Sequence, residues 1–516
     1  MSKSILKYAL IAPAAVTAVG CCSDCDTPKK PNVIVILADD LGYGDMSAYG
    51  SKAINTPNLD KLANNGVRFT DGHATSATST PSRYAMFTGM YPWKNPNARI
   101  LPADAPLLVD VNQYTMPKMF QSMGYTTAAI GKWHLGMGAG NPNWNKTVVP
   151  GANQIGFDYS CLIAATNDRV PTVYVENGDV VGLDPNDPIE VSYKKNFDGE
   201  PTALTNPEML KMDWAHGHNQ SIVNGIPRIG YMKGGDAAKW VDEDMADYFV
   251  GKVQSFLDEK GDEPFFLYYG LHQPHVPRAP HSRFVGSTKL GPRGDAVVEA
   301  DWCIGELIKM LEKKGLLENT LIVFSSDNGP VLNDGYKDMS PELNAEQNHT
   351  PTGPLRGGKY SIFDAGTRVP FFVYWKGQIK PMVSDALISQ HDLPASMAKL
   401  IGAEMPAGID SQEHLDVFMG KSTQGRDNLV VEANGMMAFR TPQYAMLPPY
   451  KGKPVNGTGN EIGIVSDFAL YDLIADLGQQ NDLAKQNPEM LAKMKSDFME
   501  ITKGYYKSNV KETKLE

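Results

Sequence analysis

Short apolar runs recur along the chain, and most of them end in polar residues. Residues 33–38 form a continuous, largely β-branched run, the pattern of a strand buried on both faces of a parallel sheet. Four further runs have a similar character, and we predict a strand in each: residues 125–130, 264–271, 321–324 and 369–375.

Segments with a helical repeat of apolar positions lie between these runs, at residues 58–65, 237–257 and 295–313. Alternating strands and helices are typical of an α/β domain. We therefore predict an α/β fold with a large doubly wound mixed sheet flanked by helices. In such sheets the functional residues lie at the carboxyl ends of the strands.

Two regions depart from this alternation. Residues from about 148 to 233 are rich in Gly, Pro, Asn and Asp, and we interpret them as an irregular insertion that covers the site and shapes substrate choice. Residues 411–516 suggest a smaller C-terminal α+β subdomain, with an edge strand over 465–470 and a closing helix over 488–505. The catalytic domain would then span residues 31–410.

The first thirty residues have the pattern of an export leader followed by a tether. Lys3 and Lys7 precede an apolar stretch over residues 8–19 that is too short to span a membrane. The sequence Ala18-Val19-Gly20-Cys21 is similar to a bacterial lipobox, with Ala18 in place of the usual Leu. We predict a lipid anchor at Cys21 and location in the periplasm or at the cell envelope, with plain signal cleavage as the alternative.

Charge and cysteine usage narrow the class of protein. The 516 residues carry a net charge of −11, which argues against a nucleic-acid partner and means that an anionic substrate would need a local positive cluster. Beyond the leader and tether, the cysteines are Cys161 and Cys303, which form either one bridge or two free thiols. Membrane association would rest on Cys21 alone.

Acidic and amide side chains follow two of the predicted strands. Asp39 and Asp40 come directly after residues 33–38, and Asp327 and Asn328 come shortly after residues 321–324. These are hard oxygen ligands without a Cys or His beside them in the sequence, so they suit Ca²⁺ or Mg²⁺ better than Zn²⁺.

A hydroxyl-rich loop leads into Ser79, which is followed by Thr80-Pro81-Ser82-Arg83 and then by Thr88-Gly89. Because Pro81 suits the first turn of a helix, we expect Ser79 just before a helix N-terminus, where the free amides favour an anion. Any serine in such a loop could also serve as a helix cap.

The run from Ser79 to Gly89 resembles the signature of the type I sulfatases, Cys/Ser-x-Pro-Ser-Arg followed by Thr-Gly. The resemblance implies that Ser79 is oxidised to formylglycine (3-oxoalanine), whose hydrated form is the nucleophile, and that Arg83 holds this group. It also implies Ca²⁺, with Mg²⁺ as the alternative, bound by the strand-end acids together with Ser79. A serine rather than a cysteine implies maturation by a serine-type radical S-adenosylmethionine enzyme.

Three further segments resemble sulfatase motifs. Gly131-Lys132-Trp133-His134 is similar to the second signature, which implies a sulfate-binding Lys132 and a base at His134. His275, in His272-Gln273-Pro274-His275, matches the general acid that protonates the leaving alcohol and contacts sulfate. Lys359 matches the second sulfate-binding lysine. Asp364 stands where most of these enzymes have Glu.

The resemblance runs from about residue 31 to 483, and residues 164–171 look like those of bacterial sulfatases that act on sulfated galactose or N-acetylgalactosamine. We expect exo-acting removal of 6-O-sulfate from such sugars in chondroitin or mucin glycans. The alternatives are a glycan sulfatase for the 4-O or another position, a phosphodiesterase or phosphonate hydrolase of the alkaline phosphatase superfamily, and a non-catalytic lipoprotein that binds sulfated glycans. The candidate sugar contacts are Asp168, Arg169, His218 and His272.

Overall fold

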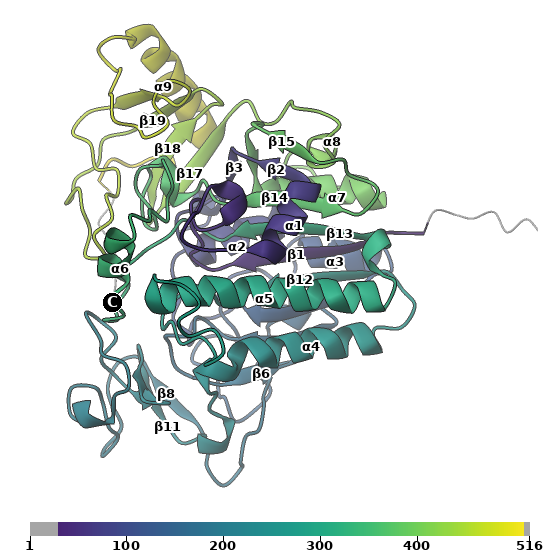
Figure 1. Cartoon of the computed structure of the whole chain (residues 1–516), viewed down its shortest axis with the longest axis vertical. Coiled ribbons are helices and arrows are strands. Elements are labelled where there is room, and N and C mark those ends of the chain that lie inside the picture. Colours follow the sequence, from purple (N-terminus) through teal and green to yellow (C-terminus); the bar gives the residue numbers. More distant parts are fainter. Residues whose placement is uncertain (1–28, 510–516) are drawn as a thin grey trace, which may run out of the picture.

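A ten-stranded mixed sheet forms the centre of the computed structural model, which describes residues 29–509 (Figure 1). Its strand order is β15-β2-β14-β13-β1-β12-β4-β5-β6-β7. The five predicted strands all form, as β1 (Asn32–Ala38), β4 (Thr126–Lys132), β12 (Phe265–Gly270), β13 (Thr320–Ser326) and β14 (Phe371–Trp375). Cys21 and the rest of the leader lie outside the described residues.

The two faces of β1 explain its continuous apolar run. Val33 and Val35 pack into one core with side chains of α2 (Ser79–Thr88), α3 (Met116–Ser122) and α7 (Leu393–Ile401). Ile34 and Ile36 pack into a second core with α1 (Pro57–Asn65), α4 (Met245–Glu259) and α5 (Gly291–Lys313). Because both faces are covered, the predicted doubly wound α/β fold is confirmed.

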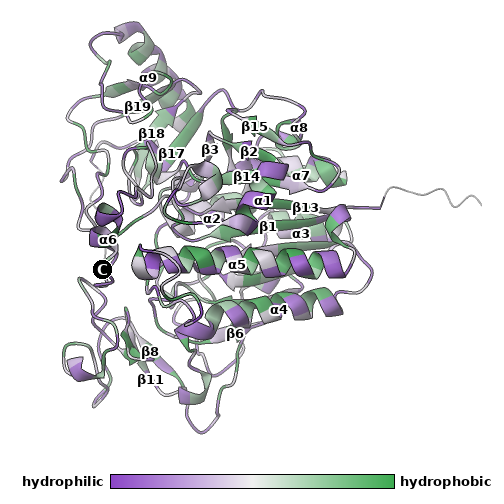
Figure 2. Cartoon of the chain, viewed as in Figure 1, coloured by the Kyte–Doolittle hydropathy of each residue, from purple (hydrophilic) through white to green (hydrophobic). Residues whose placement is uncertain are grey.

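The helices differ from their predicted limits at the N-terminal side. Figure 2 shows α4 and α5 with both apolar and polar residues along their length, as expected for helices with one face on the sheet. The segment predicted from residue 237 is helical only from Met245 onwards, after two 3-10 turns. Asp242 in the second turn is buried, and its Oδ2 lies 2.6 Å from Arg228 Nη2. This ion pair, rather than a helical repeat of apolar residues, determines the conformation of the stretch.

Part of the predicted irregular insertion belongs to the main sheet. The strands β5 (Tyr159–Ile163), β6 (Tyr174–Glu176) and β7 (Asp179–Val180) extend the sheet beyond β4. The remainder consists of turns and two short antiparallel pairs, β8 (Glu190–Ser192) with β11 (Tyr231–Lys233), and β9 (Ile222–Val223) with β10 (Ile226–Pro227).

A small antiparallel sheet forms the C-terminal unit. Its strands are β17 (Leu429–Ala433), β18 (Met436–Arg440), β19 (Tyr444–Leu447) and β20 (Ala469–Asp472), and α9 (Pro488–Thr502) packs Met494 and Phe498 into the same core. The predicted closing helix is therefore present, and the edge strand begins at Ala469. The short helix α8 (Leu415–Phe418) instead packs Phe418 beside the main sheet.

Two further features bear on the environment of the protein. Among residues 29–509, no helix combines the length and apolar character needed to cross a membrane. Cys161 and Cys303 are both buried and free, so the disulfide that would join them is not formed.

Candidate active site

The carboxyl ends of four adjacent parallel strands meet at one edge of the main sheet. Leu37 in β1 is in register with Gly270 in β12, and Gly270 with Gly131 in β4, while Ala38 in β1 pairs with Ser326 in β13. Residues that follow these positions are therefore brought together: Asp39 and Asp40, Lys132 and His134, His275, and Asp327 and Asn328.

Ser79 lies at this edge, as the first residue of α2 rather than just before it, with Thr78 as the N-cap. Its side chain is buried, with 3% of its surface exposed. The hydroxyl accepts a hydrogen bond from Lys132 Nζ at 2.9 Å and donates to Asn328 Oδ1 at 3.3 Å. Two separate strand ends thus contact the candidate nucleophile.

Lys132 and Arg83 form a buried ion-pair network with the acids. Lys132 Nζ lies 2.6 Å from Asp39 Oδ2 and 3.5 Å from Asp327 Oδ2, and Arg83 Nη2 lies 2.7 Å from Asp327 Oδ2. Burial alone would raise the pKa of Asp327, but the charges of Lys132 and Arg83 lower it well below its usual range. Arg83 therefore acts on the candidate metal ligand Asp327, while Lys132 contacts Ser79 directly.

The oxygen groups of this cluster fit a hard cation. Asp39 Oδ1 is fully buried without a hydrogen-bond partner, and Oδ2 has only the ion pair with Lys132, which lacks hydrogen-bond geometry. Burial, opposed by Lys132, raises the pKa of Asp39 well above its usual value. A buried carboxylate with a free oxygen beside Asp40, Asp327 and Asn328 is a donor set that suits Ca²⁺ or Mg²⁺.

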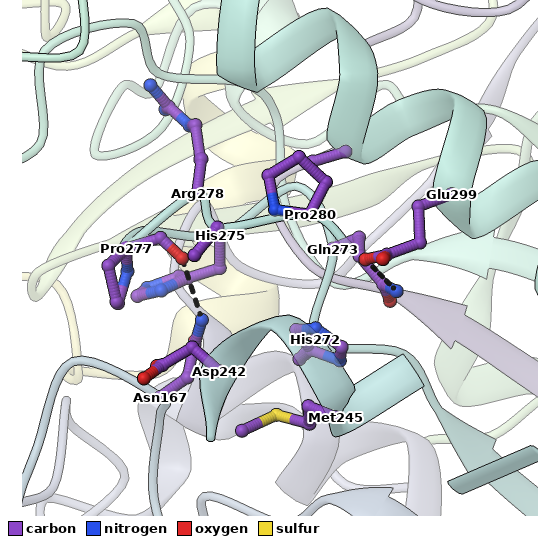
Figure 3. A pocket seen from close by; sticks show the side chains of 12 residues that line it. Asn167, Asp242, Met245, His272, Gln273, His275, Pro277, Arg278, Pro280 and Glu299 are labelled. Atoms are coloured by element: carbon purple, nitrogen blue, oxygen red, sulfur yellow. Dashed lines mark hydrogen bonds between the residues drawn. The ribbon is translucent and has the colours of Figure 1, made fainter. Parts of the chain in front are cut away.

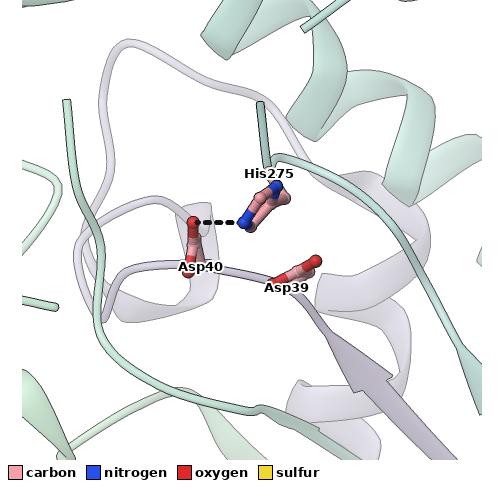
Figure 4. Close-up of side chains that lie close together, drawn as sticks. All are labelled: Asp39, Asp40 and His275. Carbon is pink, nitrogen blue, oxygen red and sulfur yellow. Dashed lines mark ion pairs between the residues drawn. The ribbon is translucent and has the colours of Figure 1, made fainter. Parts of the chain in front are cut away.

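His275 lies beside these acids, which the sequence spacing does not reveal. Its Nε2 is 3.9 Å from Asp40 Oδ2, and the atoms of Asp39, Asp40 and His275 are close enough to share an ion (Figure 4). The expectation of a site without a nearby histidine is therefore wrong in three dimensions, although oxygen donors still predominate.

A charge count around Ser79 favours a bound cation. Four carboxyl groups face three basic groups in two sets of ion pairs: Asp39 and Asp327 with Arg83 and Lys132, and Asp40 and Asp334 with Lys359. A hydrogen bond from the amide of Asp40 to Asp327 Oδ1 at 3.2 Å joins the two sets. With all four carboxyl groups ionised, the centre would be negative and would repel an anionic ester, and burial together with the charges of Asp327 and Asp40 raises the pKa of Asp39 accordingly. A divalent ion reverses the sign, so the residues present fit both a metal and an anionic substrate.

The two candidate catalytic histidines, His134 and His275, each have one ring nitrogen engaged by the backbone. His134 Nε2 bonds to Leu101 O at 3.0 Å, and its buried Nδ1 has no partner. His275 Nδ1 bonds to Val276 O at 2.6 Å, and its Nε2 faces Asp40. A ring nitrogen that donates to a carbonyl leaves the other nitrogen as the one that exchanges a proton. This nitrogen is Nδ1 in His134 and Nε2 in His275.

Burial keeps both rings neutral. Burial, with the nearby Lys132, lowers the pKa of His134 well below its usual value, and burial with Lys359 lowers that of His275 to about 4. A neutral His134 is suited to accept a proton. His275 has to gain a proton before it can act as an acid, and a negatively charged ester beside it would favour the charged form.

A cavity of about 480 Å³ opens beside Ser79. Its lining includes His134, His275 and Lys359 and also three candidate sugar contacts, Asp168, Arg169 and His218. Asp168 bonds to His218 Nε2 at 2.8 Å and to Arg169 at 3.1 Å. The structure thus brings the sulfatase-like residues and these candidate sugar contacts to one cavity.

His272 lies elsewhere. It lines a smaller, separate cavity with Met245, Gln273 and Glu299, as Figure 3 shows. His275 borders both cavities and His272 only this second one. This placement does not support the candidate role of His272 as a sugar contact.

Two residues of the site carry no recognisable sequence signal. Asp334 accepts hydrogen bonds from Lys359 Nζ at 2.8 Å and from the Tyr360 hydroxyl at 3.2 Å. The hydroxyl of Tyr268 contacts Arg83 and donates to Lys132 O at 3.0 Å. Asp334 stands in an Asn-Asp-Gly sequence that looks like an ordinary turn, and Tyr268 sits inside an apolar strand, so both depend on long-range contacts.

Comparison with known proteins decides the family. A family model described as sulfatase matches residues 31–403. The chain belongs to the sulfatase family. It is 47% identical over 481 residues to N-acetylgalactosamine-6-O-sulfatase of Bacteroides thetaiotaomicron, with 92% of this chain and 93% of that protein covered. Human arylsulfatase A is 29% identical, with 90% of this chain and 87% of that protein covered.

A solved structure agrees with this assignment. It comes from a study of the metabolism of multiple glycosaminoglycans by Bacteroides thetaiotaomicron and matches this sulfatase with a TM-score of 0.90 at 46% identity. The match covers 92% of this chain and all of that one, 100%. The sequence-based prediction of a type I sulfatase, a sulfuric ester hydrolase, is confirmed.

Proposed function

We propose that this sulfatase removes 6-O-sulfate from galactose or N-acetylgalactosamine at the ends of glycans such as chondroitin or mucin chains. The observation that carries the proposal is the shared cavity, in which Ser79 and the Asp168–His218 pair line the same walls. The 47% identity to an N-acetylgalactosamine-6-O-sulfatase supports the same substrate class.

Ser79 is the residue to be converted to formylglycine, whose hydrated form provides the attacking hydroxyl. Lys132 Nζ, 2.9 Å from Ser79 Oγ, is placed to stabilise charge on the sulfate group beside it. Lys359, held between Asp40 and Asp334, would do the same from the sugar side of the cavity.

The two histidines divide the proton transfers. His275 protonates the departing sugar oxygen through Nε2, since its Nδ1 is engaged by Val276 O. His134 accepts a proton through Nδ1 from the second hydroxyl of the hydrated group, which releases sulfate and restores the aldehyde. An unmodified serine has no second hydroxyl, so its sulfate ester would require a separate hydrolytic route.

Ca²⁺ is the metal that we assign to Asp39, Asp40, Asp327 and Asn328, together with residue 79, and Mg²⁺ is the alternative. When bound, the ion supplies positive charge to the sulfate oxygens. The protein residues orient these ligands through the Arg83–Asp327 pair and the hydrogen bond from Asn328 Nδ2 to Asp40 Oδ1 at 2.7 Å.

A panel of defined substrates tests the reaction and its position. We expect sulfate release from 6-sulfated N-acetylgalactosamine and galactose, with kcat/KM at least about tenfold lower for the 4-sulfates and for the glucosamine 6-sulfate. Faster hydrolysis of phosphate diesters or phosphonates than of any sulfate ester would contradict a sulfatase role. Tight glycan binding without any turnover would favour the non-catalytic alternative.

Maturation and export complete the proposal. A serine-type radical enzyme would oxidise Ser79, which removes two hydrogens and lowers the mass of the peptide by about 2 Da. Full activity in protein that carries only unmodified serine would contradict this step. Export to the periplasm or envelope, with a lipid on Cys21, predicts membrane-bound protein that a Cys21→Ala change releases.

A further inference from the structure

Residues 334–336 connect the two halves of the substrate cavity. On one side, Asp334 receives the ion pair from Lys359 Nζ at 2.8 Å and the hydrogen bond from the Tyr360 hydroxyl. Lys359 also pairs with Asp40 at 2.9 Å, so Asp334 sets the position of a side chain that reaches the metal ligands.

On the other side, Gly335 and Tyr336 pack against His218. Gly335 has a φ of +102°, and a Cβ added to it would lie 1.8 Å from His218 Nδ1. The ring centroids of Tyr336 and His218 are 4.7 Å apart, and the Tyr336 hydroxyl donates to Pro227 O at 2.6 Å. Any side chain at position 335 would displace the His218 ring.

His218 has little freedom to adjust. Its Nδ1 bonds to His216 O at 3.0 Å and its Nε2 to Asp168 Oδ2 at 2.8 Å. The backbone beneath it is fixed as well, because Gly335 O accepts from the amide of Ala215 at 2.8 Å. The backbone of the segment is therefore held in place, so a Cβ at position 335 displaces the His218 ring and leaves Asp334 on Lys359.

We propose that residues 334–336 are a positioning bridge between the sulfate-binding Lys359 and the sugar-facing Asp168–His218 pair. Asp334 sets the lysine, and Gly335 sets the histidine, so the chain selects esters whose sulfate lies at the matching distance from the ring hydroxyls. The inference rests on the proposed function, since it takes the cavity as the seat of a sulfated sugar.

Gly335→Ala tests the sugar side, and Gly199→Ala is its matched control. Gly199 has a φ of +80°, but an added Cβ there would meet no atom within 4 Å, so it carries the backbone strain without the clash. The readout is the ratio of kcat/KM for 6-sulfated N-acetylgalactosamine to that for nitrophenyl sulfate, an ester without a sugar ring. We expect Gly335→Ala to lower this ratio at least about tenfold and Gly199→Ala to leave it unchanged.

An equal loss on both esters, or no loss, in Gly335→Ala overturns the bridge. If that variant does not accumulate as folded protein, Tyr336→Phe removes only the hydroxyl that anchors the ring to Pro227, and the same ratio is expected to fall. An unchanged ratio in folded Tyr336→Phe would then count against the proposal.

Asp334→Asn tests the sulfate side. It takes one of two carboxylate partners from Lys359, and we expect kcat/KM to fall for the sugar and for the nitrophenyl ester alike. A loss confined to the sugar ester overturns the bridge, as does no loss.

If the wild-type protein hydrolyses nitrophenyl sulfate but not the 6-sulfated sugar, the proposed substrate fails. The ratio is then measured on other sulfated monosaccharides, and the bridge fails if Gly335→Ala affects none of them selectively.

Discussion

The main-chain carbonyl of Glu432 in β17 accepts a hydrogen bond from the amide of Ala77 at 2.7 Å, two residues before Ser79. The amide of Glu432 donates in return to Thr75 O at 3.2 Å. The family match ends at residue 403, so a strand beyond it supports the loop that presents the candidate nucleophile. The C-terminal unit is thus part of the framework of the active site.

Arg440 in β18 strengthens the same junction. Its Nη1 lies 2.8 Å from Asp71 Oδ1 and 3.1 Å from Asp364 Oδ1, and Arg368 pairs with Asp364 at 3.1 Å. Asp71, His73 and Asp364 are close enough to share a metal ion, but the two guanidinium groups already balance their charge. Asp364 belongs to this buried network, and Arg368 has a structural role in it.

Arg440→Ala should destabilise the protein by about 3–5 kcal/mol, because it leaves buried carboxylates without their partner. Urea unfolding measures the loss. Lys485→Ala, which removes an exposed charge, is the control and should change stability by less than about 0.5 kcal/mol. Similar midpoints for the two variants would show that Arg440 does not hold the junction.

Lys132→Ala should lower kcat by about 10²–10³-fold, because Lys132 is the basic group that contacts Ser79 Oγ directly. Saturation kinetics on a sulfate ester measure the change, and circular dichroism checks that the variant is folded. Lys252→Ala is the control, since Lys252 pairs with Glu176 away from the cavity. A kcat within about tenfold of wild type would exclude this role for Lys132.

The parts of the site that sequence alone predicts share one property: a strand or a motif of neighbouring residues specifies them. Continuous apolar runs identify β1 and β13, and the acids that follow them must meet because the two strands are parallel neighbours. Lys132 similarly ends β4, and His134 follows two residues later. The strand does not predict the direction of the His134 side chain, because this residue has a φ of +56°, outside the extended region.

The parts that sequence does not predict depend on contacts between distant segments. Asp334 belongs to the site because it pairs with Lys359, and Gly335 because it packs against His218. Neither pair has a characteristic spacing along the sequence. The support that Glu432 gives to the loop before Ser79 is a backbone contact, so no side-chain pattern encodes it. His272 and His275 lie three residues apart, but only His275 also borders the cavity beside Ser79, because the chain turns between them with the amide of His275 on His272 O at 3.1 Å.

Glu299→Gln should stabilise the protein at alkaline pH. Burial raises the pKa of Glu299 to about 7, against about 4.5 when unfolded. The folded state therefore binds the extra proton, and the stability that this contributes is complete below about pH 4.5 and lost as pH rises to about 7. Glutamine remains neutral, and its amide can donate to the buried, unpartnered Oε1 of Gln273 once that amide flips.

Unfolding free energies at pH 5 and pH 8 measure this effect. From pH 5 to pH 8, the free energy of unfolding of wild type should fall by about 2–3 kcal/mol more than that of Glu299→Gln. Glu306→Gln, on the same helix but in an exposed ion pair with Lys309, serves as the control and should follow wild type. If the free energy of unfolding changes equally with pH in Glu299→Gln and in wild type, the pKa of Glu299 does not differ between the folded and unfolded states.

Chelation should lower the melting temperature of the wild-type protein, and added Ca²⁺ should restore it. An ion present at 100–1,000 times its Kd stabilises a folded protein by about 3–4 kcal/mol.

Asp39→Asn should lose this response to Ca²⁺, because Asp39 offers the unpartnered buried oxygen of the site. The Asp39→Asn protein should also be at least as stable as chelated wild type. A neutral amide avoids the free-energy cost of burying a charged carboxylate, the same cost that raises the pKa of Asp39. Titration with Mg²⁺ in place of Ca²⁺ distinguishes the two ions. A chelator that leaves the wild-type melting temperature unchanged, or an Asp39→Asn protein that still responds to Ca²⁺, would contradict the assigned site.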